Sequence, residues 1–107
     1  MEFPTLKWRR YRWIHLNNVD EAALTWLKQE FDFHDLDLED SAAEKTLRPK
    51  WEVYSDHSFF IFHFASLDSL GRIKIQELKV FIGNSFIVTV APNTLAINDW
   101  FQEAKEK

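Results

Sequence analysis

The side chains with the clearest chemical potential lie in an acidic stretch between residues 32 and 44. The run His34-Asp-Leu-Asp-Leu-Glu-Asp40 places four carboxylates within six positions. Carboxylate oxygens suit Mg²⁺ and Ca²⁺, and Mg²⁺ usually takes one or two carboxylates while keeping several waters. The stretch is not an EF-hand, because Asp40 and Thr46 stand where the loop glycine and the closing glutamate are expected. The other interpretation of such a charge run is a solvated helix face, and the spacing alone leaves both open.

The sequence offers little to a catalytic centre. It has no cysteine, which excludes disulfides, thiolate zinc sites and cysteine nucleophiles. Neither His-Glu-x-x-His nor Gly-x-Ser-x-Gly occurs, and two glycines are too few for a phosphate-binding loop. His63 alternates with apolar residues in a predicted strand, where we expect it to pack in the core. We therefore expect that the protein is not an enzyme.

A short basic and aromatic run, Lys7-Trp-Arg-Arg-Tyr-Arg-Trp13, is the feature closest to a nucleic-acid surface. Cations interleaved with rings suit single strands, and the same cations could touch anionic lipid headgroups. The whole chain is acidic, however, with 13 Lys and Arg against 17 Asp and Glu and a net charge of −4. An edge strand whose arginine stems cover aromatic rings explains the run equally well. We therefore expect no nucleic-acid partner.

The elements that position these residues must come from one domain. The 107 residues are 46% hydrophobic and 28% charged, which is typical of a globular domain, and ten Phe and five Trp can fill a core. The N-terminus lacks the apolar run of a secretory signal. The longest apolar runs, at 59–62 and 86–88, are far shorter than the roughly 20 residues that cross a bilayer. We expect a single soluble domain over residues 1–107.

Hydrophobic periodicity predicts both strands and helices. We expect a helix over 19–31 with Asn18 as N-cap and Glu21 three positions on, a capping-box pattern. Residues 35–44 predict a short helix or turn, and a last helix follows Asn93 or Thr94 as its cap. Strands are expected at 12–16, 50–55, 59–67, 73–82 and 86–91. This order predicts an α+β fold: one mixed, mostly antiparallel sheet of about five strands with helices packed on it, the first strand reaching a parallel partner.

Three details of the strands can also be predicted. The strand at 59–67 is apolar on both faces, which predicts a central strand covered on both sides. In the strand at 73–82 the apolar residues change phase near Gln76–Glu77, which predicts a β-bulge there. Gly83-Asn84 suits a tight primed turn.

Several of these features together resemble the N-terminal cytoplasmic domain of the CorA-type magnesium and cobalt transporters. The motif Leu36-Asp-Leu-Glu-Asp40, then Arg48-Pro-Lys50, Tyr54 and the aromatic strand at 59–64 carry the resemblance. The lead-in Trp13-Ile-His-Leu16 and the hairpin at 78–90 agree with it. The resemblance covers about residues 12–91.

The resemblance implies a regulatory role for the acidic run. In CorA-type transporters, carboxylates of the cytoplasmic domain bind regulatory Mg²⁺ between neighbouring subunits, and the pore stays closed while the ion is bound. The matching residues here are Glu39 and Asp40, which would form a partial metal site whose partners lie outside this chain. No such role is transferred to Asp35 or Asp37. The remaining motif residues are expected to be structural: Arg48 and Lys50 offset the acidic run, Pro49 fixes the backbone before the strand, and Trp13 and Trp51 pack in the core.

The resemblance also implies a larger assembly. A full-length protein would form a homopentamer with this domain at the cytoplasmic face of the cell membrane. It would continue into a stalk helix and two membrane spans with a Gly-Met-Asn signature, whereas the one Met here is the first residue. We therefore expect a domain truncated before the stalk. The alternative is a stand-alone soluble protein-interaction module without a transport or metal role.

Overall fold

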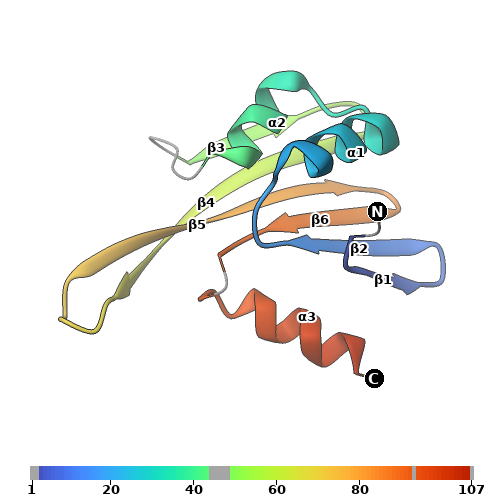
Figure 1. The fold of residues 1–107 in the computed structure, drawn as a ribbon. Helices are drawn as coiled ribbons and strands as arrows, with labels where there is room; N and C mark the ends of the chain where they lie inside the picture. The colour runs from blue at the N-terminus through green and yellow to red at the C-terminus, as the bar shows by residue number, and fades with distance from the viewer. Residues whose placement is uncertain (1–2, 44–48, 93, 107) are drawn as a thin grey trace.

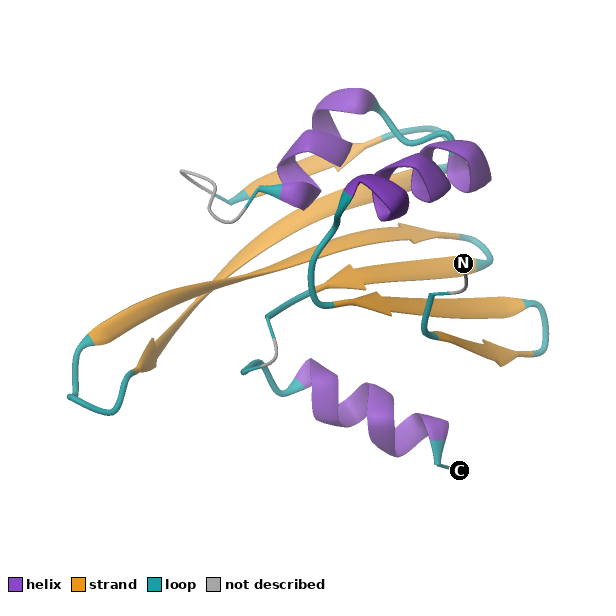
Figure 2. Cartoon of the chain, in the orientation of Figure 1, coloured by secondary structure: helices purple, strands orange, loops and turns teal. Residues whose placement is uncertain are grey.

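One six-stranded sheet organises the chain (Figures 1 and 2). The computed structural model describes residues 3–43, 49–92 and 94–106. The sheet order is β1-β2-β6-β5-β4-β3, where only β2 and β6 are parallel among the described pairs. The strands are β1 (Thr5–Trp8), β2 (Tyr11–Leu16), β3 (Lys50–Val53), β4 (His57–Leu67), β5 (Ile73–Gly83) and β6 (Phe86–Val90). The predicted α+β fold with a mixed, mostly antiparallel sheet is confirmed, and β1 is a strand that we did not predict.

Two helices, α1 (Glu21–Phe31) and α2 (Asp35–Ala42), cover one face of the sheet, and α3 (Ile97–Lys105) lies against the other (Figure 1). The main core lies under α1 and α2. Its centre is a group of three aromatic rings. The ring centroids of Phe33 and Phe81 are 4.0 Å apart in a stacked pair, and those of Phe81 and Phe59 are 4.4 Å apart. Aromatic residues therefore fill the space that a chain of this size must exclude from water.

The second face of the sheet is only partly covered. Helix α3 packs over β2, where the ring of Phe101 lies 4.8 Å from Trp13, so Trp13 packs as predicted. The prediction that the strand at 59–67 is covered on both sides is wrong, because Phe62 remains 45% exposed on this face and Leu67, at the far end of the other face, is 71% exposed. The core assignment of Trp51 is also wrong: it is 69% exposed and packs against Phe60, with their ring centroids 5.3 Å apart. The physical reason is the position of α3, which lies over β2 rather than over β3 and β4.

Strand β5 is continuous, and the predicted β-bulge at Gln76–Glu77 is wrong. It pairs with β4 without interruption from His57↔Gly83 to Leu67↔Ile73. The apolar phase changes because the charged residues Glu77 and Lys79 continue the face of Ile73 and Ile75 and are buried there. Toward its far end the β4–β5 pair continues beyond the other strands as a twisted ribbon (Figure 2).

The hairpin turn between β5 and β6 differs from the predicted primed turn. Among the described residues, positive φ occurs only at Arg9, Asp32 and Gly71, so the turn at residues 84–85 is not of the primed type. Gly83 is needed for space instead, since a Cβ at this position would lie 2.5 Å from the ring of Phe86.

The predicted helix caps are wrong by a few residues. Asp20 caps α1 by accepting a hydrogen bond from the Ala23 amide at 2.8 Å, so neither Asn18 nor the capping box begins this helix. Helix α3 follows Ala96 without a side-chain cap. The hydroxyl of Thr94 instead accepts a hydrogen bond from the side-chain amide of Gln76. The other predicted cap, Asn93, lies outside the described residues, as does Glu44 at the predicted end of α2.

Candidate metal site on helix α2

Helix α2 directs its acidic residues to two different sides. Asp37 and Asp40 are three positions apart, so both lie on the helix face that meets the sheet edge. The Asp37 side chain is 1% exposed, whereas that of Asp40 is 37% exposed. Glu39 is exposed, and Leu38 is buried in the core. The acidic run is therefore neither wholly solvated nor wholly buried.

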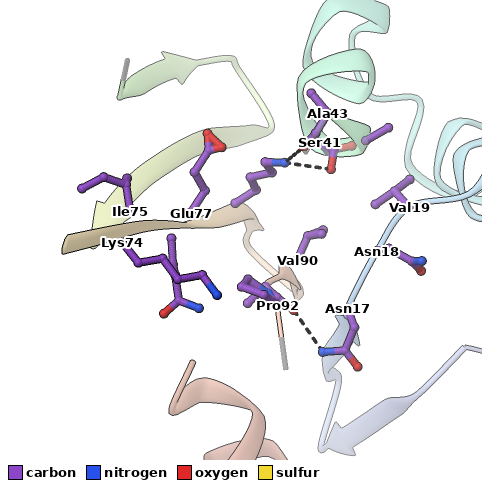
Figure 3. A pocket seen from close by; sticks show the side chains of 14 residues that line it. Asn17, Asn18, Val19, Ser41, Ala43, Lys74, Ile75, Glu77, Val90 and Pro92 are labelled. Atoms are coloured by element: carbon purple, nitrogen blue, oxygen red, sulfur yellow. Dashed lines mark hydrogen bonds between the residues drawn. The ribbon is translucent and has the colours of Figure 1, made fainter. Parts of the chain in front are cut away.

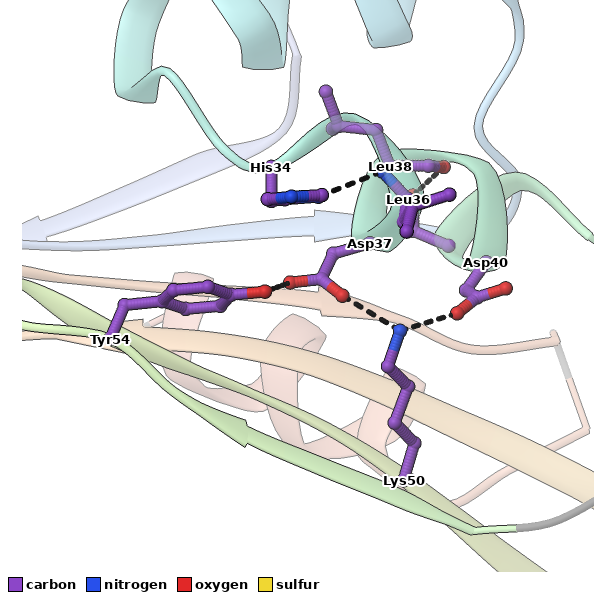
Figure 4. Close-up of polar contacts among 8 residues, drawn as sticks. His34, Leu36, Asp37, Leu38, Asp40, Lys50 and Tyr54 are labelled. Carbon is purple, nitrogen blue, oxygen red and sulfur yellow. Dashed lines mark hydrogen bonds and ion pairs between the residues drawn. The ribbon is translucent and has the colours of Figure 1, made fainter.

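Lys50 links the two inward aspartates (Figure 4). It reaches from the start of β3, and its Nζ lies 2.8 Å from Oδ1 of Asp37 and 2.7 Å from Oδ2 of Asp40. The Tyr54 hydroxyl donates a hydrogen bond of 2.5 Å to the other oxygen of Asp37. The prediction that Lys50 offsets the acidic run is confirmed by this geometry, while Arg48 lies outside the described residues.

These contacts shift the protonation equilibria of Lys50 and Tyr54. Burial disfavours the Lys50 ammonium, but the hydrogen bonds and charges of Asp37 and Asp40 outweigh it and raise the pKa of Lys50. Burial and then the hydrogen bond to Asp37 raise the pKa of Tyr54 to about 12. At neutral pH Lys50 is therefore an ammonium and Tyr54 a neutral phenol.

The predicted site residues Glu39 and Asp40 do not converge on one point within a single chain. Adjacent positions on a helix diverge, and no described group of three His, Asp or Glu side chains could hold a metal ion. Oδ1 of Asp40 accepts no hydrogen bond from a described residue, and Glu39 forms no ion pair within the described ranges. A metal ion at either side chain would therefore have one carboxylate ligand from the described residues, and its other ligands would have to be water or another molecule.

Asp37 belongs to the charged cluster with Asp40 and Lys50, although we did not single it out from the sequence. Its i, i+3 spacing to Asp40 was a usable signal, because it places both carboxylates on one helix face. What the spacing did not reveal is that this face meets the sheet, where Lys50 and Tyr54 approach it.

A second lysine fixes the C-terminal end of α2. Lys79 of β5 is 5% exposed and donates hydrogen bonds to the carbonyl oxygens of Ser41, at 3.4 Å, and Ala43. Burial lowers the pKa of Lys79, although the charges of Glu77 and Asp40 oppose this effect. Lys50 and Lys79 together tie the acidic helix to the sheet at two points.

A cavity of about 530 Å³ lies beside this second contact (Figure 3). It is bounded by the C-terminal end of α2 and by the segments that follow the parallel strands β2 and β6. Asn17, Ser41, Glu77 and Pro92 are among the residues that line it. Its buried polar groups already have partners: Lys79 binds the helix carbonyls, Ser41 donates to the Leu38 carbonyl at 2.7 Å, and Glu77 lies 3.4 Å from His63.

The basic and aromatic run forms the hairpin of β1 and β2. The guanidinium of Arg9 lies 4.7 Å from the Trp8 ring, and that of Arg12 lies 5.0 Å from the Phe31 ring. Arg12 also forms a 3.0 Å ion pair with Glu30. These arginines cover aromatic rings, as the edge-strand interpretation predicted.

Within the described residues, no helix has both the length and the apolar character that crossing a membrane requires.

Comparison with known proteins connects this domain to a transporter family. A family model described as "CorA-like Mg2+ transporter protein" matches residues 8–107, and the match confirms the resemblance found in the sequence. No curated protein matches the chain.

Solved structures share the fold at low sequence identity. The soluble domain of CorA from Methanocaldococcus jannaschii has a TM-score of 0.72 at 20% identity over 92% of this chain and 38% of that one. The complete CorA magnesium transporter from the same organism gives 0.70 at 17% identity over 95% and 32%. The full-length CmaX protein gives 0.66 at 18% identity over 87% and 29%. The chain therefore spans between 29% and 38% of the length of these proteins.

Proposed function

Because the chain belongs to the CorA-like Mg²⁺ transporter family, we propose that it is the cytoplasmic regulatory domain of a divalent-cation transporter. The observation that carries this proposal is the family match over residues 8–107. This range contains strands β2 to β6 and the helices α1, α2 and α3. In the proposed protein, further segments supply the stalk and the membrane spans. The domain lies at the inner face of the membrane and senses Mg²⁺, or Co²⁺ in its place.

Glu39 and Asp40 are the proposed contribution of this chain to the sensing site. The exposed Glu39 carboxylate and Oδ1 of Asp40, the oxygen that Lys50 does not bind, are acceptors on a helix that Lys50 and Lys79 hold against the sheet. A fixed helix presents such acceptors in a constant geometry, which favours selective binding over a flexible acidic loop.

The proposed mechanism needs a second copy of the chain. Clustered carboxylates of neighbouring copies in a homopentamer repel each other unless a cation lies between them. Mg²⁺ therefore stabilises the associated arrangement, and its loss favours separation. The ion can shift the equilibrium between the two arrangements only by the difference in its affinity for them.

The alternative function is a protein-interaction module without a metal role. It is favoured by the exposed apolar side chains of the uncovered sheet face, Trp51, Phe62 and Phe64. An exposed apolar patch of this kind marks an interaction surface in many proteins. The two functions differ in whether divalent cations affect helix α2 at all.

An NMR titration of the ¹⁵N-labelled domain with Mg²⁺ tests the proposal. We expect saturable shifts centred on the amides of Glu39 and Asp40, with a dissociation constant in the millimolar range for one carboxylate ligand. Glu39→Gln and Asp40→Asn should each weaken the shifts several-fold. Glu103→Gln, which removes an exposed carboxylate from α3, is the matched control and should leave them unchanged. Uniform shifts, or equal responses of all three variants, would favour the interaction module.

A further inference from the structure

Lys50 occupies the position that a bound cation would take between two carboxylates. Its Nζ lies 2.8 Å from Asp37 and 2.7 Å from Asp40 (Figure 4). It also lies 5.6 Å from the centre of the Phe59 ring. The Lys50 side chain as a whole is 24% exposed. Lys50 is thus a tethered cation at the edge of the proposed metal site.

The same two carboxylates would otherwise suit a divalent ion. One or two carboxylates plus water are what Mg²⁺ usually takes from a protein, and i, i+3 spacing on one helix brings two carboxylates to one side. The Tyr54 hydroxyl already orients Asp37 through its second oxygen. The ammonium of Lys50 satisfies the remaining oxygen of Asp37 and one oxygen of Asp40.

We propose that Lys50 is an affinity-setting residue: an internal cation that closes the Asp37–Asp40 pair to divalent ions and leaves the Glu39 carboxylate and Oδ1 of Asp40 to bind them. This inference rests on the proposed function, because it concerns the strength of the same Mg²⁺ site. Lys50 keeps the isolated domain's affinity low, since its charge repels an ion at Asp40 and its ammonium occupies one of the oxygens. Tight binding then depends on ligands from a neighbouring copy, which makes the site responsive to assembly.

The expected effect follows from Coulomb's law. A single positive charge about 5 Å from a divalent ion, in surroundings close to the dielectric constant of water, weakens binding by about tenfold. Removal of the charge should therefore strengthen Mg²⁺ binding by at least that factor, and the freed Asp37 carboxylate adds a second ligand.

The test compares Lys50→Met with the wild-type domain by Mg²⁺ titration and thermal unfolding. We expect the Mg²⁺ dissociation constant, read from the amides of residues 37–40, to fall at least tenfold. The variant should melt at a lower temperature without Mg²⁺, because Asp37 then lies buried without its cation, and added Mg²⁺ should restore the melting temperature far more than in the wild type. The matched control is Lys28→Met, since Lys28 also bridges two aspartates, Asp32 and Asp35 at 3.2 Å each, but from an exposed position. This control should change Mg²⁺ binding at residues 37–40 less than twofold.

If Lys50→Met does not fold, a second variant tests whether Lys50 weakens Mg²⁺ binding. Asp37→Asn combined with Lys50→Met removes the buried charge together with its counter-ion, so no buried carboxylate is left unpaired. Asp40 is still freed from the ammonium, and we expect Mg²⁺ to bind there about threefold tighter than in the wild type. Affinities equal to the wild type in the variants that fold would overturn the inference. That result differs from failure of the proposed function, in which Glu39→Gln and Asp40→Asn leave the wild-type response unchanged.

Discussion

Replacement of Asp37 by alanine tests whether one buried carboxylate holds helix α2 on the sheet. The Asp37 side chain is 1% exposed, and its two oxygens accept hydrogen bonds from Lys50 and Tyr54. The alanine variant would leave the Tyr54 hydroxyl without this acceptor and the Lys50 ammonium with Asp40 alone. The perturbation thus removes two charge-assisted contacts at once.

The magnitude can be worked from these contacts. A hydrogen bond to a charged group contributes about 1.5–3 kcal/mol, and a buried pair that loses one partner costs about 3–5 kcal/mol. Because Lys50 keeps its bond to Asp40, we expect the lower end, about 3 kcal/mol. For a domain of this size this lowers the melting temperature by more than about 10 °C.

Urea denaturation of the variant and of a double-mutant cycle with Tyr54→Phe provides the assay. The two substitutions should be non-additive by about 1 kcal/mol or more, because they remove the same hydrogen bond. Asp35→Ala is the control, since the Asp35 side chain is 80% exposed on the same helix, and it should change the free energy of unfolding by less than about 0.5 kcal/mol. A loss below about 1 kcal/mol for Asp37→Ala would refute the reasoning, because the buried ion pair would then contribute little.

Two further predictions concern the core and the pH dependence. Phe81→Ala, at a fully buried ring, should cost about 3–5 kcal/mol, whereas Phe62→Ala on the uncovered sheet face should cost about 1 kcal/mol; equal losses in urea denaturation would contradict the assignment of the two faces. Because the folded state raises the pKa of Tyr54 to about 12 from its ordinary value near 10, the resulting stability is fully present below pH 10 and is lost as the pH rises toward 12. The difference in unfolding free energy between the wild type and Tyr54→Phe should therefore shrink across this range, and a constant difference would contradict a pKa of Tyr54 raised by burial and by the Asp37 hydrogen bond.

The fold could be predicted from hydrophobic periodicity because most elements have one buried side. Helix α1 was found from its stripe of apolar residues, and strands β2 and β6 from their short apolar runs between polar turns. That β2 has a parallel partner followed from the order of the elements and is confirmed, and the structure identifies this partner as β6. Strand β1 was missed because it is only four residues long, although Leu6 and Trp8 alternate with Thr5 and Lys7.

The errors share a physical cause, which is that periodicity does not report what covers a face. Phe62 and Phe64 are large and apolar but lie where α3 does not reach, so a strand that resembles a fully covered one has an open side. Glu77 and Lys79 have the opposite property, since they are charged and yet buried. Because they interrupt the apolar pattern on the covered face, the sequence wrongly predicted a β-bulge there. Helix caps were misplaced because Asn18 and Asp20 are both good caps, and only the backbone path selects Asp20.

The candidate site could be located from its motif but not resolved into roles. The acidic run and the Arg48-Pro-Lys50 segment indicated where charges of opposite sign would meet. Asp37 is buried, Asp40 is bound by Lys50 and Glu39 is exposed. These different environments depend on how α2 is rotated against β3. That rotation is set by the buried Leu38 and by long-range contacts to Lys50 and Tyr54, which no local pattern contains.

Paramagnetic relaxation by Mn²⁺, which takes the same oxygen ligands as Mg²⁺, is the most direct measurement of whether a divalent ion binds α2 at Glu39 and Asp40. At substoichiometric Mn²⁺ we predict selective broadening of the amides of Glu39, Asp40 and their helical neighbours, reversed by excess Mg²⁺ and reduced in Asp40→Asn. Broadening centred on another part of the domain, or broadening that Mg²⁺ does not reverse, would contradict the proposed site.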